Sequence, residues 1–126
     1  MLNKVQLIGR LGTDPDYRCT PSGTPVATFS LATSERRKDK DGEVREFTEW
    51  HNIVTWRTLA DTCRNYLTKG KLVYVEGRIR TRKYQDKDGQ DRYITEIVAD
   101  QVKFLEKVKD LCWFDAPNNH QEDDPF

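Results

Sequence analysis

The chain has 126 residues, and its 21 Lys or Arg and 21 Asp or Glu give a formal net charge of zero. This length suits one domain, and a hydrophobic content of 36% allows only a thin core, which would gain from association with further copies. The longest apolar runs are a few residues, which excludes a bilayer-spanning helix. Residues 1–4 lead directly into an alternating pattern, so we also expect no secretory signal.

Cysteine and histidine usage argues against disulfides and metal sites. Cys19, Cys63 and Cys112 are odd in number and far apart, no Cys-x-x-Cys pair occurs, and the chain has only two histidines. A disulfide framework needs paired cysteines, and a structural zinc site needs clustered Cys or His ligands. We therefore expect no metal, no cofactor and a reducing, cytoplasmic location.

The zero net charge hides an asymmetry along the chain. Residues 1–105 carry 19 Lys or Arg against 15 Asp or Glu, a net charge of +4, and residues 106–126 carry −4. Four cations also fall within six residues at the positions Arg78, Arg80, Arg82 and Lys83. A basic body with an acidic tail indicates a polyanionic partner for the body, although chance scatter would also give a difference of this size.

Alternation of apolar and polar residues, and enrichment in β-branched and aromatic residues, predict five strands. Their expected ranges are 3–11, 26–33, 44–56, 71–84 and 92–105. Pro and Gly at residues 14–23 indicate a loop between the first two strands.

Two of the connections carry the same tetrapeptide. Asp-Lys-Asp-Gly occurs at residues 39–42, between the second and third strands, and again at residues 86–89, between the fourth and fifth. Asp-Gly between strand-like segments is typical of a hairpin turn. A calcium-binding loop would need Gly at its sixth position, whereas Gly is fourth here, so the sequence predicts two similar hairpin tips.

One helix is predicted between the third and fourth strands. Thr58 is a suitable N-cap, and Lys69 with Gly70 is a suitable stop. Cys63 on the apolar face is then a small core residue rather than a reactive thiol. The spacing of this face is followed by Leu59, Ala60, Cys63, Tyr66 and Leu67.

The predicted order is β-β-β-α-β-β. It is the order of a five-stranded Greek-key barrel, the OB-fold, which binds oligonucleotides or oligosaccharides across one face. We therefore predict an all-β domain with one helix over residues 1–105, followed by a short flexible acidic tail over residues 106–126.

No catalytic signature accompanies this fold. The motifs G-x-S-x-G, G-x-x-x-x-G-K-[ST] and G-x-G-x-x-G are all absent. Gly9 and Gly12 are expected to allow a barrel bend or a close backbone approach. His51 is expected to be a hydrogen-bonded sheet or interface histidine rather than a general base. We predict that the protein is not an enzyme.

Aromatic and basic residues form the remaining candidate site. Trp50 and Trp56 are six residues apart, so an unbroken strand puts both indoles on one face, either as core or as a stacking platform. Tyr84 favours the platform because it follows the cations of residues 80–83. In single-strand binding, cations follow the phosphates while bases stack on rings.

A series of motifs extends over nearly all of residues 1–105. The motifs are Asn3-Lys4-Val5, Gly9 through Asp14-Pro15, Thr20-Pro21-Ser22-Gly23, Leu31-Ala32-Thr33-Ser34-Glu35, Thr48-Glu49-Trp50-His51, Tyr66-Leu67 with Lys69-Gly70, Val75-Glu76-Gly77, and Arg80-Thr81-Arg82-Lys83 with Gly89-Gln90-Asp91-Arg92-Tyr93. In order and spacing they resemble the bacterial single-stranded DNA-binding protein family. The resemblance implies an OB-fold, a homotetramer, and sequence-tolerant binding of single-stranded DNA in replication, recombination and repair, without catalysis.

The resemblance also assigns roles to residues. Base-stacking positions of the family fall on Trp50, Trp56 and Tyr84, and a further one falls on Arg37, whose guanidinium plane could lie flat on a base. His51 falls in a segment near the family's subunit contacts.

Fewer cations than usual stand at the family's DNA-backbone positions. Asn52 and Thr58 occupy places where some members carry cations, so backbone contacts should be fewer at these two places. The better candidates for DNA-backbone contacts are Arg10, Lys40, Lys69, Arg80, Arg82 and Lys83.

The end of the chain resembles the family's acidic tip, which implies recruitment of replication and repair proteins; a disordered, solubilising end is the alternative. Compared with the family, the linker is short and the apolar residue before Pro is missing. The tip residues are Glu122, Asp123, Asp124, Pro125 and Phe126. An apolar cluster at residues 111–114, Leu-Cys-Trp-Phe, could pack on the barrel, join a subunit interface or contact partners.

Two other functions stay open on the sequence. An OB-fold replication accessory that mainly binds proteins would have weak DNA affinity. A nuclease would need a metal-dependent active site, for which the sequence offers no coherent carboxylate cluster.

Overall fold

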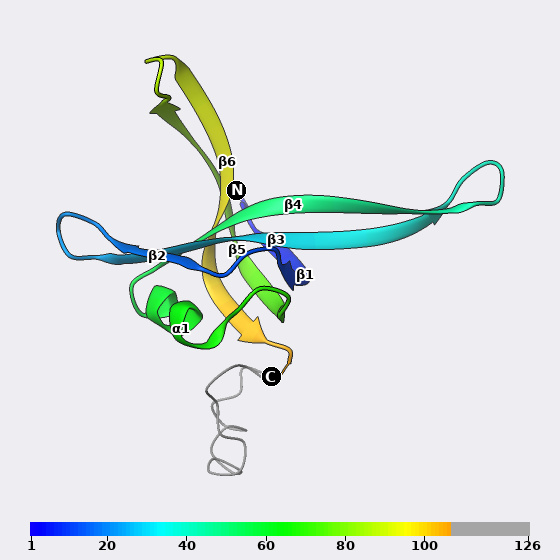
Figure 1. Ribbon diagram of the computed structural model, residues 1–126, viewed down its shortest axis with the longest axis horizontal. Helices are drawn as coiled ribbons and strands as arrows, with labels where there is room; N and C mark the ends of the chain where they lie inside the picture. The colour runs from blue at the N-terminus through cyan, green and yellow to red at the C-terminus, as the bar shows by residue number, and fades with distance from the viewer. Residues whose placement is uncertain (107–126) are drawn as a thin grey trace, which may run out of the picture.

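The computed structural model describes residues 1–106, and these residues form six strands and one helix (Figure 1). The five predicted strands and the helix are present in the predicted order. No described helix is long and apolar enough to cross a membrane. The elements are β1 (Val5–Leu11), β2 (Asp16–Cys19), β3 (Pro25–Lys38), β4 (Val44–Trp56), α1 (Thr58–Tyr66), β5 (Leu72–Gln85) and β6 (Asp91–Phe104).

Five of the strands close into a barrel. Neighbouring strands follow the order β1-β5-β6-β4-β3, and β1 returns to pair with β3 at Arg10 and Leu11. The pair β4–β6 is parallel, through Ile53 and Val54, whereas the other pairs are antiparallel. This closed barrel confirms the predicted OB-fold.

The barrel interior is filled by alternate residues of its strands and capped by α1. Cys63 in α1 and Leu67, directly after α1, are fully buried. Four strand residues are fully buried with them: Leu31, Ile53, Val73 and Val75. Burial raises the pKa of the Cys63 thiol to about 12, although a hydrogen bond with Thr55 acts in the opposite direction. Cys63 is thus a core residue, as predicted.

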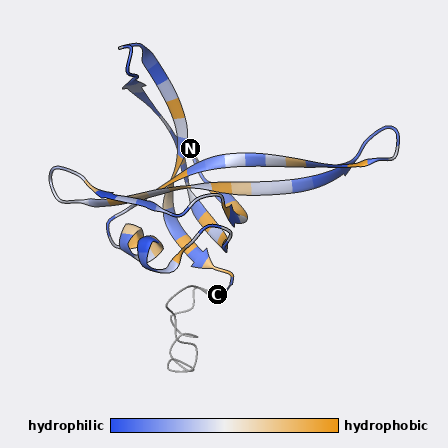
Figure 2. Cartoon of the chain, viewed as in Figure 1, coloured by the Kyte–Doolittle hydropathy of each residue, from blue (hydrophilic) through white to orange (hydrophobic). Residues whose placement is uncertain are grey.

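Two long hairpins leave the barrel and project in different directions (Figure 1). They are the distal parts of β3–β4 and β5–β6, and their ends are hydrophilic (Figure 2). β3 runs five residues beyond its expected end at residue 33, and Lys38 pairs with Val44. Residues 34–38 are exposed and polar on both faces, so no alternation marked them as a strand.

The two hairpin tips are built alike, as their shared tetrapeptide predicted. Asp39 Oδ1 accepts hydrogen bonds from the backbone N–H groups of Asp41 and Glu43, and its Oδ2 accepts one from Arg45 Nε at 3.1 Å. Asp86 accepts the same set from Asp88, Gln90 and Arg92. Gly42 and Gly89 take φ values of 81° and 77° in these turns. Each tip is therefore a turn that the side chain of its own first Asp stabilises by hydrogen bonds.

The short strand β2 lies where the sequence predicted only a loop. It pairs with β3 from Asp16↔Thr28 to Cys19↔Pro25, and four residues are too few to give a periodic signal. Tyr17 joins β2 to α1, because its hydroxyl donates to Asp61 Oδ1 at 2.7 Å.

The predicted helix ends were wrong. Thr58 is the first helical residue, and the N-cap is Arg57, which makes no side-chain capping hydrogen bond. The helix stops at Tyr66 rather than at Lys69, because Leu67 turns to an extended conformation and buries its side chain. Tertiary burial thus overrides the local stop signal.

Candidate nucleic-acid interface

Trp50 and Trp56 lie together on the outer face of the barrel. The β3–β4 register is unbroken from Val26↔Trp56 to Lys38↔Val44, so the two indoles share one face of β4. Ile53, of opposite parity, is fully buried in the core. Trp50 is 60% exposed, and Trp56 is half-buried. The strand geometry therefore places both rings outside the core.

The indole of Trp50 rests against β1's end. A Cβ placed on Gly12 would lie 2.3 Å from Trp50 Cζ3 and 2.7 Å from Ser30 Oγ, so a larger residue at position 12 would displace the ring. The other predicted close approach is also present, since a Cβ on Gly9 would lie 2.2 Å from the carbonyl oxygen of Ala32. Trp50 is thus a supported but exposed ring.

The same outer face continues onto the β5–β6 hairpin. Val54 pairs with Val98, which in turn pairs with Arg78, and Arg80, Arg82 and Tyr84 follow on that face of β5 by alternation. Tyr84 is 43% exposed. The fold therefore joins the two tryptophans, two arginines and the tyrosine into one surface, although they come from separate strands.

A buried carboxylate holds the two arginines. Glu96 is 3% exposed and its Oε1 accepts hydrogen bonds from Arg80 and from Arg82 Nε, the latter at 3.0 Å. The guanidinium groups remain partly exposed. The three side chains carry a net charge of +1, and the carboxylate orients both guanidiniums on the outer face.

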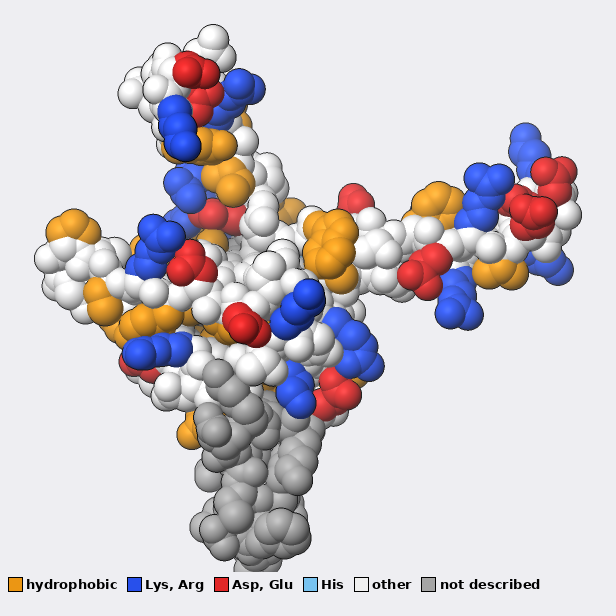
Figure 3. Space-filling model, viewed as in Figure 1, with side chains coloured by type: hydrophobic (Ala, Val, Ile, Leu, Met, Phe, Trp, Pro, Cys, Tyr) orange, Lys and Arg blue, Asp and Glu red, His pale blue; other side chains and the backbone are white. Residues whose placement is uncertain are grey.

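The other cations predicted to contact the DNA backbone differ in whether an acidic side chain pairs with them. Arg10 Nη1 donates to Glu106 Oε1 at 2.8 Å, and Lys83 Nζ lies 3.0 Å from Asp91, on the face of β5 opposite Tyr84. Lys40 and Lys69 are exposed and have no ion pair within the described part of the chain. Figure 3 shows acidic and basic side chains intermixed on both hairpins.

Arg37 does not join the tryptophans. By strand parity it lies on the opposite face of the β3–β4 hairpin from Trp50. There its guanidinium pairs with Glu35 and lies 4.8 Å from the ring centroid of Phe47. It stacks on a ring of its own hairpin.

Arg18 is a candidate that sequence reasoning missed. It pairs with Val26, which pairs with Trp56, so all three side chains share one row of the outer face. Asp16 lies 3.3 Å from Arg18 Nε. Only the pairing of β2, which the sequence did not predict, brings Arg18 to this face.

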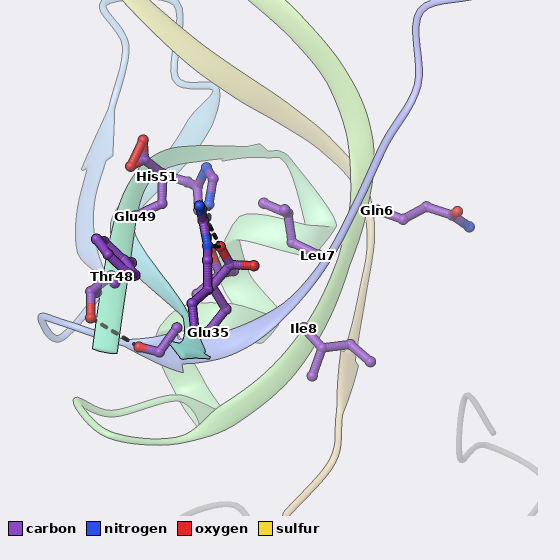
Figure 4. Close-up of a pocket in the computed structure, with 11 residues that line it drawn as sticks. Gln6, Leu7, Ile8, Glu35, Thr48, Glu49 and His51 are labelled. Atoms are coloured by element: carbon purple, nitrogen blue, oxygen red, sulfur yellow. Dashed lines mark hydrogen bonds and ion pairs between the residues drawn. The ribbon is translucent and has the colours of Figure 1, made fainter. Parts of the chain in front are cut away.

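His51 lies on the face of β4 opposite Trp50 and Trp56. It lines a groove of about 660 Å³ between β1 and the β3–β4 hairpin (Figure 4). Its Nε2 is 2.9 Å from Thr33 Oγ1, which confirms a hydrogen-bonded sheet histidine. Figure 4 shows Leu7 pointing into this groove, whereas Gln6 and Ile8 point away from it.

The tip residues 122–126 and the cluster at residues 111–114 lie outside the described residues. Within residues 1–106, no group of three or more His, Cys, Asp or Glu side chains is arranged to hold a metal ion.

The chain is similar to proteins named for single-stranded DNA binding. Over 104 residues the chain is 56% identical to a protein of Neisseria meningitidis serogroup B named single-stranded DNA-binding protein, and over 105 residues it is 54% identical to single-stranded DNA-binding protein 1 of Chlorobaculum tepidum. Each alignment covers 82% of this chain but only 60% and 65% of the respective relative.

A solved structure shares the fold. It is titled Plasmodium falciparum SSB complex with ssDNA; its TM-score is 0.77 at 41% identity, and the match covers 84% of this chain and 97% of the other. The model of the single-strand binding protein family matches residues 2–105, which is the whole barrel with both hairpins. The chain belongs to the single-strand binding protein family.

Proposed function

We propose that this protein binds single-stranded DNA without strong sequence preference and performs no chemical step. The observation that carries the proposal is the joint outer face, on which Trp50, Trp56 and Tyr84 accompany Arg80 and Arg82. Membership of the family, and relatives named for single-stranded DNA binding, support the same conclusion.

The exposed rings of this face suit stacking on DNA bases more than sequence recognition by hydrogen bonds to base edges. Every base has a flat face, so exposed rings accept any sequence, with each stacked base worth roughly 1–3 kcal/mol. Arginines held by Glu96 present donors to phosphate oxygens, and Lys40 and Lys69 add charges that no described acid neutralises. Binding should therefore be tolerant of sequence and sensitive to salt.

A titration with labelled oligo(dT) at two salt concentrations tests this function. We expect binding that weakens as salt rises, with a slope of log K against log salt of about −0.7 for each neutralised phosphate. A duplex of equal length should bind far more weakly. Weak, salt-independent binding of oligo(dT) would instead favour the alternative, an accessory that mainly binds proteins.

Glu96→Gln tests whether Glu96 limits the charge of this face. The amide keeps the shape of the side chain but raises the local net charge from +1 to +2. We expect tighter oligo(dT) binding at low salt and a slope steeper by about 0.7. Glu49→Gln, on the opposite face of β4, removes the same charge elsewhere and should leave the slope unchanged. Equal slopes for the two variants would contradict the proposed role of Glu96.

The proposal includes assembly of copies into a homotetramer through the region of β1 and His51. β5 pairs with one edge of β1 from Val5 to Arg10, whereas β3 pairs with the other edge only at Arg10 and Leu11. Among the described residues, the second edge of residues 5–9 has no strand neighbour. An open edge favours pairing with another strand, and the groove at His51 lies beside it.

Ile8→Glu tests this assembly. Ile8 lies on β1 and is 59% exposed in the single chain, so a charge there should leave the fold intact and disfavour contact between copies. Size-exclusion chromatography with light scattering should show fewer than four copies. Val44→Glu, at a residue 65% exposed on the β3–β4 hairpin, is the matched control and should not change the mass. A tetrameric Ile8→Glu variant would exclude β1 as the contact.

Roles in replication, recombination and repair, in the cytoplasm with the nucleoid, complete the proposal. In this scheme residues 1–105 bind DNA, residues 106–126 form an acidic tail, and residues 122–126 recruit partner proteins. The charge difference between the two parts, +4 and −4, supports this division of work. Glu106 contributes to the barrel as well, since it accepts hydrogen bonds from Arg10 and from the backbone N–H of Leu72.

A further inference from the structure

Arg57 has an unusual backbone conformation. Its φ and ψ are 62° and −130°, and it is the one residue other than glycine with a positive φ within residues 1–106. A side chain with a Cβ is strained in this region, which glycine occupies readily. The other positive φ values in the described chain belong to glycines, all in turns or loops. At position 57 the chain therefore keeps arginine at a cost in stability.

The folded chain gives no local reason for an arginine there. The backbone N–H of Arg57 donates to Pro25 O at 2.9 Å, and its carbonyl accepts from the N–H of Asp61 at 3.2 Å. Glycine would make both bonds. The side chain does not cap α1, is exposed, and makes no hydrogen bond or ion pair with a described residue. Strained residues without a structural role are expected at functional sites.

The neighbours of Arg57 point to its role. It directly follows Trp56, so the two Cα atoms are about 3.8 Å apart. Other arginines of the outer face already have acidic partners: Arg18 has Asp16, and Arg80 and Arg82 share Glu96. Arg57 is thus an exposed arginine without a described acidic partner, directly beside Trp56 at the end of β4.

We propose that Arg57 is a further phosphate-binding residue, which holds the backbone of the nucleotide whose base stacks on Trp56. The inference rests on the proposed single-stranded DNA binding and extends it to a residue outside the predicted set. A guanidinium offers a planar pair of donors that fits two phosphate oxygens. Because no described acid competes for it, contact with phosphate breaks no existing ion pair.

Three substitutions at Arg57 separate the effect of its backbone strain on stability from the effect of its proposed phosphate contact on binding. Arg57→Gly relieves the strain and removes the charge, Arg57→Gln removes only the charge, and Arg57→Lys keeps the charge. We expect the Gly variant to melt roughly 3–6 °C higher than the wild type without DNA, at equal protein concentration. Gly and Gln variants should bind oligo(dT) roughly 3- to 10-fold more weakly at low salt, with slopes shallower by about 0.7. The Lys variant should retain most of the affinity.

Arg64→Gln, in the last turn of α1, removes the same charge farther along the helix and should keep the wild-type slope. Gly and Gln variants with wild-type affinity and slope would overturn the phosphate contact. A Gly variant that melts no higher than the wild type would overturn the inference that arginine is kept at a cost. If the wild-type protein itself did not bind oligo(dT), the proposed function would fail. That result differs from an unchanged affinity of the variants and from an unchanged melting temperature of the Gly variant.

Discussion

Alanine at Trp50 or at Trp56 is expected to weaken binding of oligo(dT) by about 5- to 150-fold each, which corresponds to the roughly 1–3 kcal/mol of one stacked base. Both rings lie on the outer face, and neither belongs to the core cluster. The variants should therefore fold. Fluorescence anisotropy of a labelled oligonucleotide measures the affinity, and thermal unfolding measures the stability. In the wild type, tryptophan fluorescence should fall as DNA binds.

The controls follow from the same geometry. Phenylalanine at each position keeps a ring and should recover most of the affinity. Tyr93→Ala removes an aromatic side chain that is 70% exposed but lies on the face of the β5–β6 hairpin opposite Tyr84, so it should change binding little. If Trp56→Ala unfolds the barrel and its folded fraction binds DNA normally, Trp56 supports the structure rather than the DNA.

The barrel could be predicted because its strands bury one face. Alternation such as Val73 and Val75 in β5 marks each buried segment, and the apolar spacing around Cys63 marks the helix. The distal hairpins bury neither face, so the end of β3 was predicted five residues too early, and only the repeated turn sequence indicated where the hairpins reverse. Long-range pairing, not local pattern, makes these segments strands.

The residue types of the candidate site could also be predicted, but their partners could not. Parity correctly placed Trp50 and Trp56 on one face. It could not show that Glu96, fourteen positions beyond Arg82, is buried against it, or that Arg37 stacks on Phe47. Ion pairs depend on register between strands, which a single sequence does not specify. The number of cations in the sequence therefore overstates the positive charge that is free to meet phosphate. Arg57 is exposed and has no acidic partner among the described residues.

Deletion of residues 122–126 is expected to abolish capture of replication and repair proteins from a cell lysate, while the barrel remains folded. Residues 115–126 contain four acids and no Lys or Arg, and the segment ends in Pro125 and Phe126. An aromatic ring beside carboxylates suits a pocket with basic residues around it. Phe126→Ala keeps every acid and should reduce capture, which separates the contribution of the ring from that of the charge.

The same deletion should affect DNA binding in the opposite direction. An acidic segment tethered to a basic face competes with DNA at a high effective concentration. Its removal should therefore strengthen oligo(dT) binding slightly at low salt, and the gain should fade as salt screens the interaction. Phe126→Ala should not share this gain, because its charge is unchanged. A truncated protein that captures the same partners as the intact chain would show that the segment only improves solubility, and recruitment by residues 122–126 would be wrong.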